Sequence, residues 1–346
     1  MRKTALFFLI LVAIAVMLIV GCERKVVIEE GVEESPECFV CHGDNDALIV
    51  SAQQEWRNSV HGSGANVDYT NRSSCPECHD HQGFLEFQAT GEVNAPYENV
   101  TAIHCFTCHA PHTNGTLELR VDDAYELMNG VDFDHGEANL CANCHHSRFD
   151  VRDIVDGWEQ GSTRFPSHHG PQADLIEGTG GYEMDGYTYA QSTHKNAVEN
   201  ACIGCHMSNP ETHEGYKIGG HSWNMEDPET GYNLYETCAE CHDAAGDAED
   251  FDFRAATDST DYDWNGELEG YQTEVEGLLD SLAVLLVAEG ALNANHSPIA
   301  QVFDDANIAG AMHNYGMIEE DRSEGVHNFQ YIVSLLQNSI DYLDNL

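Results

Sequence analysis

Cys38-Phe39-Val40-Cys41-His42 is the first of six five-residue segments that share the pattern Cys-x-x-Cys-His. The other five are Cys75-Pro76-Glu77-Cys78-His79, Cys105-Phe106-Thr107-Cys108-His109, Cys141-Ala142-Asn143-Cys144-His145, Cys202-Ile203-Gly204-Cys205-His206 and Cys238-Ala239-Glu240-Cys241-His242. We number these segments units 1 to 6 in chain order. Together they contain twelve of the thirteen cysteines, so no set of cysteines remains for a disulfide framework.

Each unit has the pattern of a covalent attachment site for haem c, in which two thiols bond the porphyrin vinyl groups and the adjacent imidazole binds the iron. A single segment of this kind could instead be half of a zinc site or a redox pair. Zinc would need a second pair of ligands for each metal, and it gives no reason for a histidine in every fifth position. We therefore interpret the chain as a multihaem c-type cytochrome with six covalently bound haem c groups. The proximal iron ligands are then His42, His79, His109, His145, His206 and His242.

The spacing of the units bears on the fold. Six haems between residues 38 and 242 leave little protein around each, so the haems must supply much of the buried apolar surface and lie close together. Long alternating strand patterns are absent, and glycines and short polar runs separate the units. The sequence predicts a haem-packed domain over 37–246 that is mainly α with extensive loops and little β structure.

The charge excludes one class of function. The chain has 60 acidic and 14 basic residues, and its formal net charge is −46. Binding to nucleic acid depends on basic patches that contact phosphates, so we expect no nucleic-acid partner. The negative charge is typical of a solvated surface, and it can also steer the protein toward cationic partners or positively charged minerals.

The N-terminus has the features of a secretory signal. Two basic residues precede an apolar run over 5–20, which ends in Ile19-Val20-Gly21-Cys22. We predict a lipoprotein signal peptide over 1–21 and lipidation of Cys22, the cysteine outside the units. The alternative is an uncleaved transmembrane anchor. An unpaired cysteine directly after a small residue favours the lipoprotein.

Residues 22–36 are charged and have no apolar periodicity, which predicts a tether. Export is required on separate grounds, because c-type haems are attached outside the cytoplasm in bacteria. Glu23 follows the predicted lipidation site and favours the outer membrane over retention in the inner one. We expect an exported protein, lipid-anchored to the outer membrane on its periplasmic or cell-surface face.

Several histidines outside the units are candidates for distal ligands, which bind the second axial face of an iron. The first five candidates are His61, His104, His135, His194 and His221. His194 lies eight residues before unit 5, and His221 lies after it on a loop that begins Gly219-Gly220. His104 directly precedes unit 3, so it can serve only a neighbouring haem. His112, His168 and His169 are reserve candidates.

The composition changes after unit 6. Residues 247–266 are rich in Asp, Ala and Gly, which predicts a solvated acidic linker. Residues 267–346 carry three amphipathic patterns that predict a helical hairpin or bundle. The first face comprises Leu268, Tyr271, Val275, Leu278, Leu282 and Leu285, the second helix is expected around 299–318, and the third face comprises Ile332, Leu335, Leu336, Ser339, Ile340 and Leu343. Surplus apolar surface here could serve a homo-oligomer or filament.

One C-terminal stretch resembles a known family. Asn314-Tyr315, together with the run Asp321-Arg322-Ser323-Glu324-Gly325-Val326-His327-Asn328-Phe329-Gln330-Tyr331, is similar to the end of multihaem cytochromes related to cytochrome c nitrite reductase and hydroxylamine oxidoreductase. In that group a Gly-x-His-Asn step supplies a distal haem ligand, and the resemblance implies this role for His327. The catalytic haem of nitrite reductase usually has a Lys in place of the proximal His. All six units here end in His, so the resemblance does not extend to catalysis.

The supply of histidines bears on function. Haem iron transfers electrons when both axial positions are filled and reacts with substrates when one is open. Six of the 20 histidines belong to the units, and the other 14 are more than six distal positions require. This favours an electron carrier, between a periplasmic redox protein and an outer-membrane, mineral or other extracellular acceptor. The alternative is a multihaem oxidoreductase that acts on nitrite, hydroxylamine or a sulfur oxyanion at one five-coordinate haem.

Overall fold

The computed structural model describes residues 47–64, 70, 75–94, 96–97, 99–114, 116–155, 170–239, 241–242 and 252–346. All of these belong to one unit of the fold, which begins at Ala47. Unit 1 with Cys38, Cys41 and His42, the predicted lipidation site Cys22, and the reserve candidates His168 and His169 lie outside the described residues. Their predicted roles stay predictions.

Short helices dominate the chain up to residue 242. They are α3 (Ala47–Arg57), α4 (Val60–Ser63), α5 (Pro76–His79), α6 (His81–Thr90), α7 (Cys105–Cys108), α8 (Pro111–Asn114), α9 (Asn139–Ala142), α10 (Val151–Val155), α11 (Gln172–Glu177), α12 (His194–Ala197), α13 (Cys202–His206) and α14 (Glu236–Ala239), with 3-10 turns η2 (Gly136–Ala138) and η3 (Gly220–Ser222). Units 2 to 6 each overlap one of these helices. In units 2, 3, 4 and 6 the backbone N–H of the His donates to the carbonyl of the first Cys at 2.9–3.1 Å. This single helical turn places the two thiols of a unit on the same side.

The described strands are short and form three antiparallel pairs. They are β1 (Tyr125–Glu126) with β2 (Asp132–Phe133), β3 (Glu211–His213) with β4 (Tyr216–Ile218), and β5 (Glu226–Asp227) with β6 (Tyr232–Asn233). The prediction of a mainly α fold with extensive loops and little β structure is confirmed. In the described part of the chain, no helix has both the length and the apolar character needed to cross a membrane.

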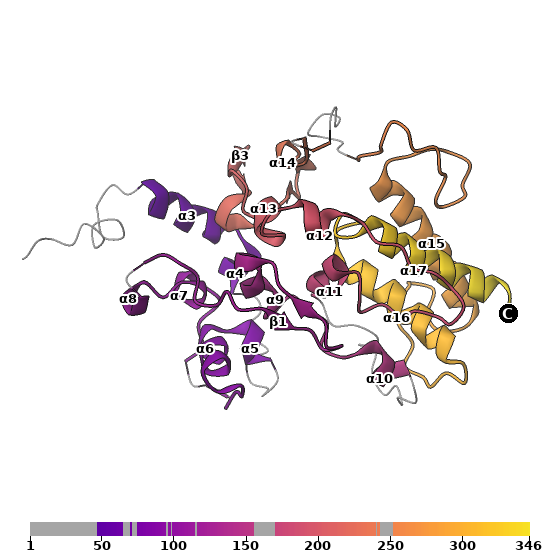
Figure 1. Ribbon diagram of the computed structural model, residues 1–346, viewed down its shortest axis with the longest axis horizontal. Helices are drawn as coiled ribbons and strands as arrows, with labels where there is room; N and C mark the ends of the chain where they lie inside the picture. The colour runs from indigo at the N-terminus through magenta and orange to yellow at the C-terminus, as the bar shows by residue number, and fades with distance from the viewer. Residues whose placement is uncertain are drawn as a thin grey trace, which may run out of the picture. The chain divides into compact units, whose positions relative to one another are not determined.

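Three longer helices end the chain and lie side by side in Figure 1: α15 (Tyr271–Ala288), α16 (Ala306–Asp321) and α17 (Phe329–Asp344). Asp305 and Asn328 cap α16 and α17, because their side chains accept hydrogen bonds from backbone N–H groups of the first turn. The apolar faces of α15 and α17 meet in the main core, in which Leu278, Leu282, Leu335 and Leu336 are fully buried. The predicted helical region is therefore a three-helix bundle.

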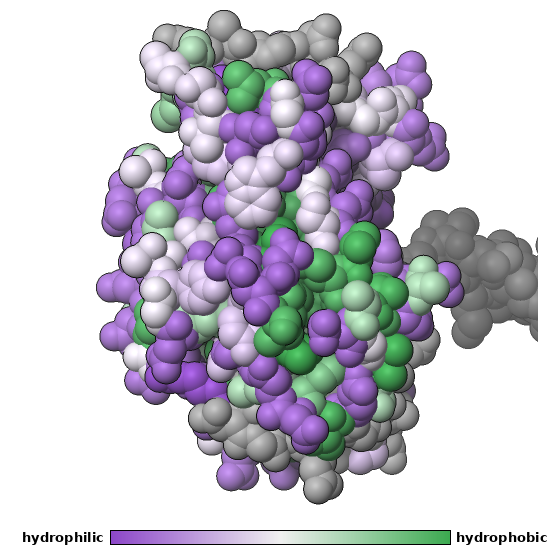
Figure 2. Space-filling model, turned by 90° about the vertical axis from the view of Figure 1, so that its right-hand side faces the viewer, coloured by the Kyte–Doolittle hydropathy of each residue, from purple (hydrophilic) through white to green (hydrophobic). Residues whose placement is uncertain are grey.

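Two details of that prediction are wrong. Leu268 precedes α15 and is 55% exposed, because the helix begins only at Tyr271. The second helix begins at Ala306 and not near residue 299, since Asp305 supplies its N-cap. Figure 2 shows an apolar area within the hydrophilic surface on the side of the molecule where the bundle lies. The expectation of a homo-oligomer stays a prediction.

The segment between α11 and α12 packs against the C-terminal bundle, and in Figure 1 it runs along α16 and α17. Tyr182 and Asn314 exchange two hydrogen bonds, from Tyr182 N to Asn314 Oδ1 at 2.7 Å and from Asn314 Nδ2 to Tyr182 O at 3.0 Å. Ser192 N donates to Asn328 Oδ1 at 2.8 Å, at the start of α17. These contacts hold the residues just before α17 close to unit 5.

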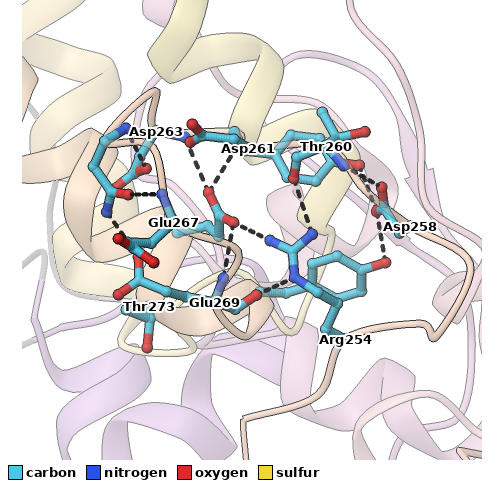
Figure 3. Close-up of polar contacts among 12 residues, drawn as sticks. Arg254, Asp258, Thr260, Asp261, Asp263, Glu267, Glu269 and Thr273 are labelled. Carbon is cyan, nitrogen blue, oxygen red and sulfur yellow. Dashed lines mark hydrogen bonds and ion pairs between the residues drawn. The ribbon is translucent and has the colours of Figure 1, made fainter.

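Residues 252–270 form a hydrogen-bonded loop on α15, whereas the sequence predicts a solvated linker up to residue 266. The loop closes around Glu274, which is fully buried. Figure 3 shows polar contacts of this loop, among them those of Arg254 and Asp258. The Glu274 carboxylate accepts hydrogen bonds from the backbone N–H groups of Tyr262 at 2.7 Å and Asp263 at 3.0 Å, and it pairs with the Arg254 guanidinium. Composition predicts solvation here, but one buried ion pair organises the loop.

Candidate haem-binding site

Four of the described units place their proximal histidine opposite a second imidazole from a distant part of the chain. The ring centroids are 6.3 Å apart for His109 and His221, 6.1 Å for His145 and His61, 6.3 Å for His206 and His327, and 6.0 Å for His242 and His194. An imidazole nitrogen binds a metal at about 2.0–2.1 Å, so two rings on opposite sides of one iron have centroids roughly 6 Å apart. The distance within each pair therefore leaves room for one metal ion between the two rings.

The cysteine thiols of units 2 to 6 are also placed as haem attachment requires. All ten cysteines of units 2 to 6 are free in the described structure. In each unit two thiols and one imidazole lie within a single helical turn, which is the donor set that covalent haem attachment requires. The residues present therefore fit haem c at units 3 to 6 with both axial ligands. When bound, the haem supplies a one-electron Fe(III)/Fe(II) couple.

Hydrogen bonds at Nδ1 fix which ring nitrogen faces the metal position. Nδ1 lies within hydrogen-bonding distance of an oxygen in four of the paired histidines: His145 to Gln172 Oε1 at 3.2 Å, His194 to Val326 O at 2.7 Å, His206 to Trp223 O at 2.9 Å and His327 to Asp321 Oδ1 at 2.7 Å. Because Nδ1–H donates to these oxygens, Nε2 carries the lone pair. Contacts of this kind orient metal-binding histidines and raise their basicity.

His221 is held through α3. Its backbone N–H donates to Glu55 Oε2 at 3.0 Å, and its Nδ1 lies 3.7 Å from the same oxygen. Glu55 is only 3% exposed, and its other carboxylate oxygen accepts from Ser51 Oγ at 2.6 Å. The sequence places Glu55 one residue before Trp56 but gives no signal for this role, since the contact joins residues 166 positions apart.

Burial affects the protonation of these rings. It lowers the pKa of His61 to about 4, and it also lowers the pKa of His145, His206, His221 and His242. Burial acts in the same direction on His327, but the Asp321 carboxylate beside it more than offsets this, so its pKa lies above the usual value. Neutral imidazole is the form that binds a metal. Burial therefore favours this neutral form in the rings whose pKa it lowers.

Two predicted distal ligands have other contacts. His104 caps α7, where its Nδ1 accepts a hydrogen bond from Phe106 N at 3.3 Å, and its ring lies 4.3 Å from that of His81. His135 Nε2 lies 2.5 Å from Glu177 Oε1. The structure brings neither ring opposite a proximal histidine among the residues it describes.

His146, which directly follows a proximal ligand, uses both ring nitrogens within the protein. Its Nδ1 donates to Ser147 O at 2.7 Å, and its Nε2 accepts from Tyr125 OH at 3.0 Å. This arrangement leaves no lone pair for a metal. His146 is therefore a structural residue, although it lies next to unit 4.

The units also contact one another out of chain order. The Cys78 thiol of unit 2 donates to Asn143 O at 3.7 Å, and the Cys144 thiol of unit 4 donates to Glu77 O at 3.8 Å. This reciprocal pair of contacts places units 2 and 4 side by side. Units 4 and 5 meet in a small apolar cluster that includes Ala142 and Cys202. Unit 4 thus adjoins both unit 2 and unit 5.

Replacing Asp321 by Asn should raise the midpoint potential of one haem and leave its coordination unchanged. The substitution removes a negative charge that makes His327 a stronger donor and stabilises ferric iron. A redox titration followed by the haem absorption bands measures the shift. Glu319→Gln is the matched control, because it removes the same charge from an exposed position two residues earlier. Identical titration curves for both variants would contradict the role of Asp321.

No protein-family model and no curated protein matches this chain. Solved structures that are similar include the outer cell wall cytochrome OcwA, at 20% sequence identity and a TM-score of 0.49, with 84% of this chain and 49% of that chain covered. They also include an undecahaem cytochrome from the S-layer of Carboxydothermus ferrireducens, at 20% identity and a TM-score of 0.46, with 85% of this chain and 40% of that chain covered. The chain spans about half the length of the first cytochrome and two fifths of the second.

Proposed function

We propose that the chain is a hexahaem c-type cytochrome that transfers electrons along closely spaced bis-histidine haems. The observation that carries this proposal is the set of four imidazole pairs, each about 6 Å apart and each including the proximal histidine of a unit. Filled axial positions leave no coordination site for a substrate at these four haems. Two imidazole ligands also change little between ferric and ferrous iron, which favours fast transfer.

The contacts between units support a continuous path. The Cys78 sulfur lies 3.7 Å from the Asn143 carbonyl oxygen and the Cys144 sulfur lies 3.8 Å from the Glu77 carbonyl oxygen, which places units 2 and 4 side by side. Units 4 and 5 share an apolar cluster. The distal ligands of units 5 and 6 are tied to one segment, because His327 serves unit 5 and the carbonyl of Val326 accepts from His194 opposite unit 6. Electrons can therefore pass between neighbouring haems without a mobile carrier.

For units 1 and 2 we also propose histidines as distal ligands, with His104 as the first candidate. His104 keeps Nε2 available, since its hydrogen bond from Phe106 uses Nδ1. His112, His168 and His169 remain further candidates. His135 is less suited, because Glu177 occupies its Nε2.

All six haems are expected to be low-spin in the ferric state, and the reduced protein is expected not to bind carbon monoxide. Potentials should be low and spread over a broad titration, because imidazole stabilises ferric iron and the six environments differ. Absorption spectra with and without carbon monoxide, and a titration on an electrode, measure both properties. One carbon monoxide per protein, together with turnover of nitrite or hydroxylamine at about 1 per second or faster, would show an oxidoreductase instead.

We also propose that the protein is exported and anchored through lipid on Cys22, so that it passes electrons from a periplasmic donor to an outer-membrane or extracellular acceptor. The motivation is the basic start, the apolar run and the Val20-Gly21-Cys22 junction. Mass spectrometry of the native protein should show acyl chains on Cys22 together with six haems. A mature product that retains residues 1–21 would exclude the lipoprotein signal.

A further inference from the structure

The loop after β4 brings parts of three haem sites to one residue. Its 3-10 turn η3 contains His221 and ends at Ser222, and Trp223 follows directly as the C-cap residue. The loop is fixed on both sides: Gly219 N donates to Asn224 O at 2.8 Å, and Asn224 Nδ2 donates to Asn58 O at 3.2 Å. Trp223 therefore has a defined position between α3, α4 and α13.

Trp223 touches ligands of three different units. Its ring centroid lies 4.7 Å from that of His61, opposite unit 4, and 5.8 Å from that of His221, opposite unit 3. Both contacts are edge-to-face, with interplanar angles of 78° and 69°. The backbone carbonyl of Trp223 accepts the Nδ1–H of His206, the proximal histidine of unit 5, at 2.9 Å.

The backbone of Trp223 is in the left-handed region, with φ at +55°. A bulky residue is an outlier there, and such conformations persist where the surroundings require them. Glycine would adopt this conformation without strain. The chain thus has a tryptophan at a position where the backbone conformation alone favours glycine.

We propose that Trp223 is a positioning residue shared by three haems. Its indole ring sets the orientation of the distal imidazoles of His61 and His221, and its carbonyl sets that of His206. This inference rests on the proposed haem ligation. It adds that one residue adjusts three haems together, those of units 3 and 4 through its indole ring and that of unit 5 through its backbone carbonyl.

The ring orientations provide a measurable signature. The imidazole planes are 72° apart in the pair of His61 and His145, and 43° apart in the pair of His109 and His221. In a low-spin ferric haem the angle between the two ligand planes determines the anisotropy of the electron paramagnetic resonance signal. Nearly perpendicular planes give a more anisotropic signal than planes closer to parallel. The haem of unit 4 should therefore contribute one of the more anisotropic signals.

The experiment compares Trp223→Gly with Trp264→Gly in the full, haem-loaded protein. Trp264 is the matched control, because it also has positive φ, at +64°, but is 56% exposed and has no ring contact with a histidine in the described part of the chain. Trp223→Gly retains the carbonyl and removes only the indole. We expect six attached haems, shifted resonance signals for the haems of units 3 and 4, and carbon monoxide binding by up to two haems after reduction. Trp223→Phe keeps an aromatic ring and should give a smaller shift.

The outcomes separate this inference from the proposed function. If the unsubstituted protein already shows high-spin haems or fewer than six haems, the proposed bis-histidine cytochrome fails. If the unsubstituted protein is fully low-spin, and Trp223→Gly gives the same resonance signals and carbon monoxide binding as Trp264→Gly, the positioning role of Trp223 fails. A shift confined to Trp223→Gly supports it.

Discussion

Arg254→Ala is expected to destabilise the folded protein by about 3–5 kcal/mol, because it leaves a buried carboxylate without its counter-charge. The Glu274 side chain is fully buried, with a relative exposure of 0%. Asp261 and Asp263 each bring a carboxylate oxygen within 4.8 Å of the other acidic ligand atoms of this cluster. Loss of the Arg254 guanidinium would therefore leave concentrated negative charge beside α15.

Chemical unfolding followed by the helical circular dichroism signal measures this effect. The matched control is Arg322→Ala, whose side chain is 78% exposed and lies 4.0 Å from Glu320. A surface ion pair of this kind contributes about 0–1 kcal/mol. Replacing Arg254 and Glu274 together by Met should recover much of the lost stability, because no unpaired charge then remains buried. Equal stability of the two Arg→Ala variants would show that the buried pair does not organise the loop.

His327→Ala is expected to convert one of the six haems to a five-coordinate, high-spin form. Its ring centroid lies 6.3 Å from that of His206, and in the described part of the chain no other imidazole ring packs against the ring of His206. All six haems should stay attached, since the thioether bonds of unit 5 do not involve residue 327. The reduced variant should bind one carbon monoxide per protein.

The control is His296→Ala, which removes an exposed histidine in the turn between α15 and α16. This variant should keep the spectrum of the unsubstituted protein. If His327→Ala also leaves the spectrum unchanged, the axial position opposite His206 is filled by another residue, and the resemblance that singled out His327 is misleading.

Local sequence context predicts which residues can form haem sites, but not how they pair. Each of units 2 to 6 overlaps a short helical turn, and His61, His194 and His221 have contexts that predict a distal position. The spacing along the chain does not predict which proximal histidine each of them faces. His61, for example, lies opposite His145 of unit 4, although units 2 and 3 lie between them in the sequence. All units have the same Cys-x-x-Cys-His pattern, so the sequence does not show which distal histidine belongs to which proximal one. Only the folded chain shows this pairing.

Polar contacts outside the motif limit what the sequence can predict. His104 and His135 have the same kind of local context as the paired histidines, but neither lies opposite a proximal histidine in the described part of the chain. The N-terminus of α7 engages Nδ1 of His104, and the Glu177 carboxylate engages Nε2 of His135. In the acidic segment after unit 6, composition predicts solvent exposure, whereas the Arg254–Glu274 pair folds the chain against α15. The apolar faces of α15 and α17 were predictable because helical periodicity alone determines them.

The side-by-side arrangement of units 2 and 4 has a consequence for biogenesis. In the exported cytochrome that we propose, unit 2 would reach the attachment machinery well before unit 4, and His221 and His327 would follow later still. Haems attached early would then lack their final neighbours and, at units 3 and 5, their proposed distal ligands. Long-range contacts of this kind slow folding. Maturation should thus pass through states with exposed, incompletely ligated haem, and the C-terminal bundle completes the last of these sites.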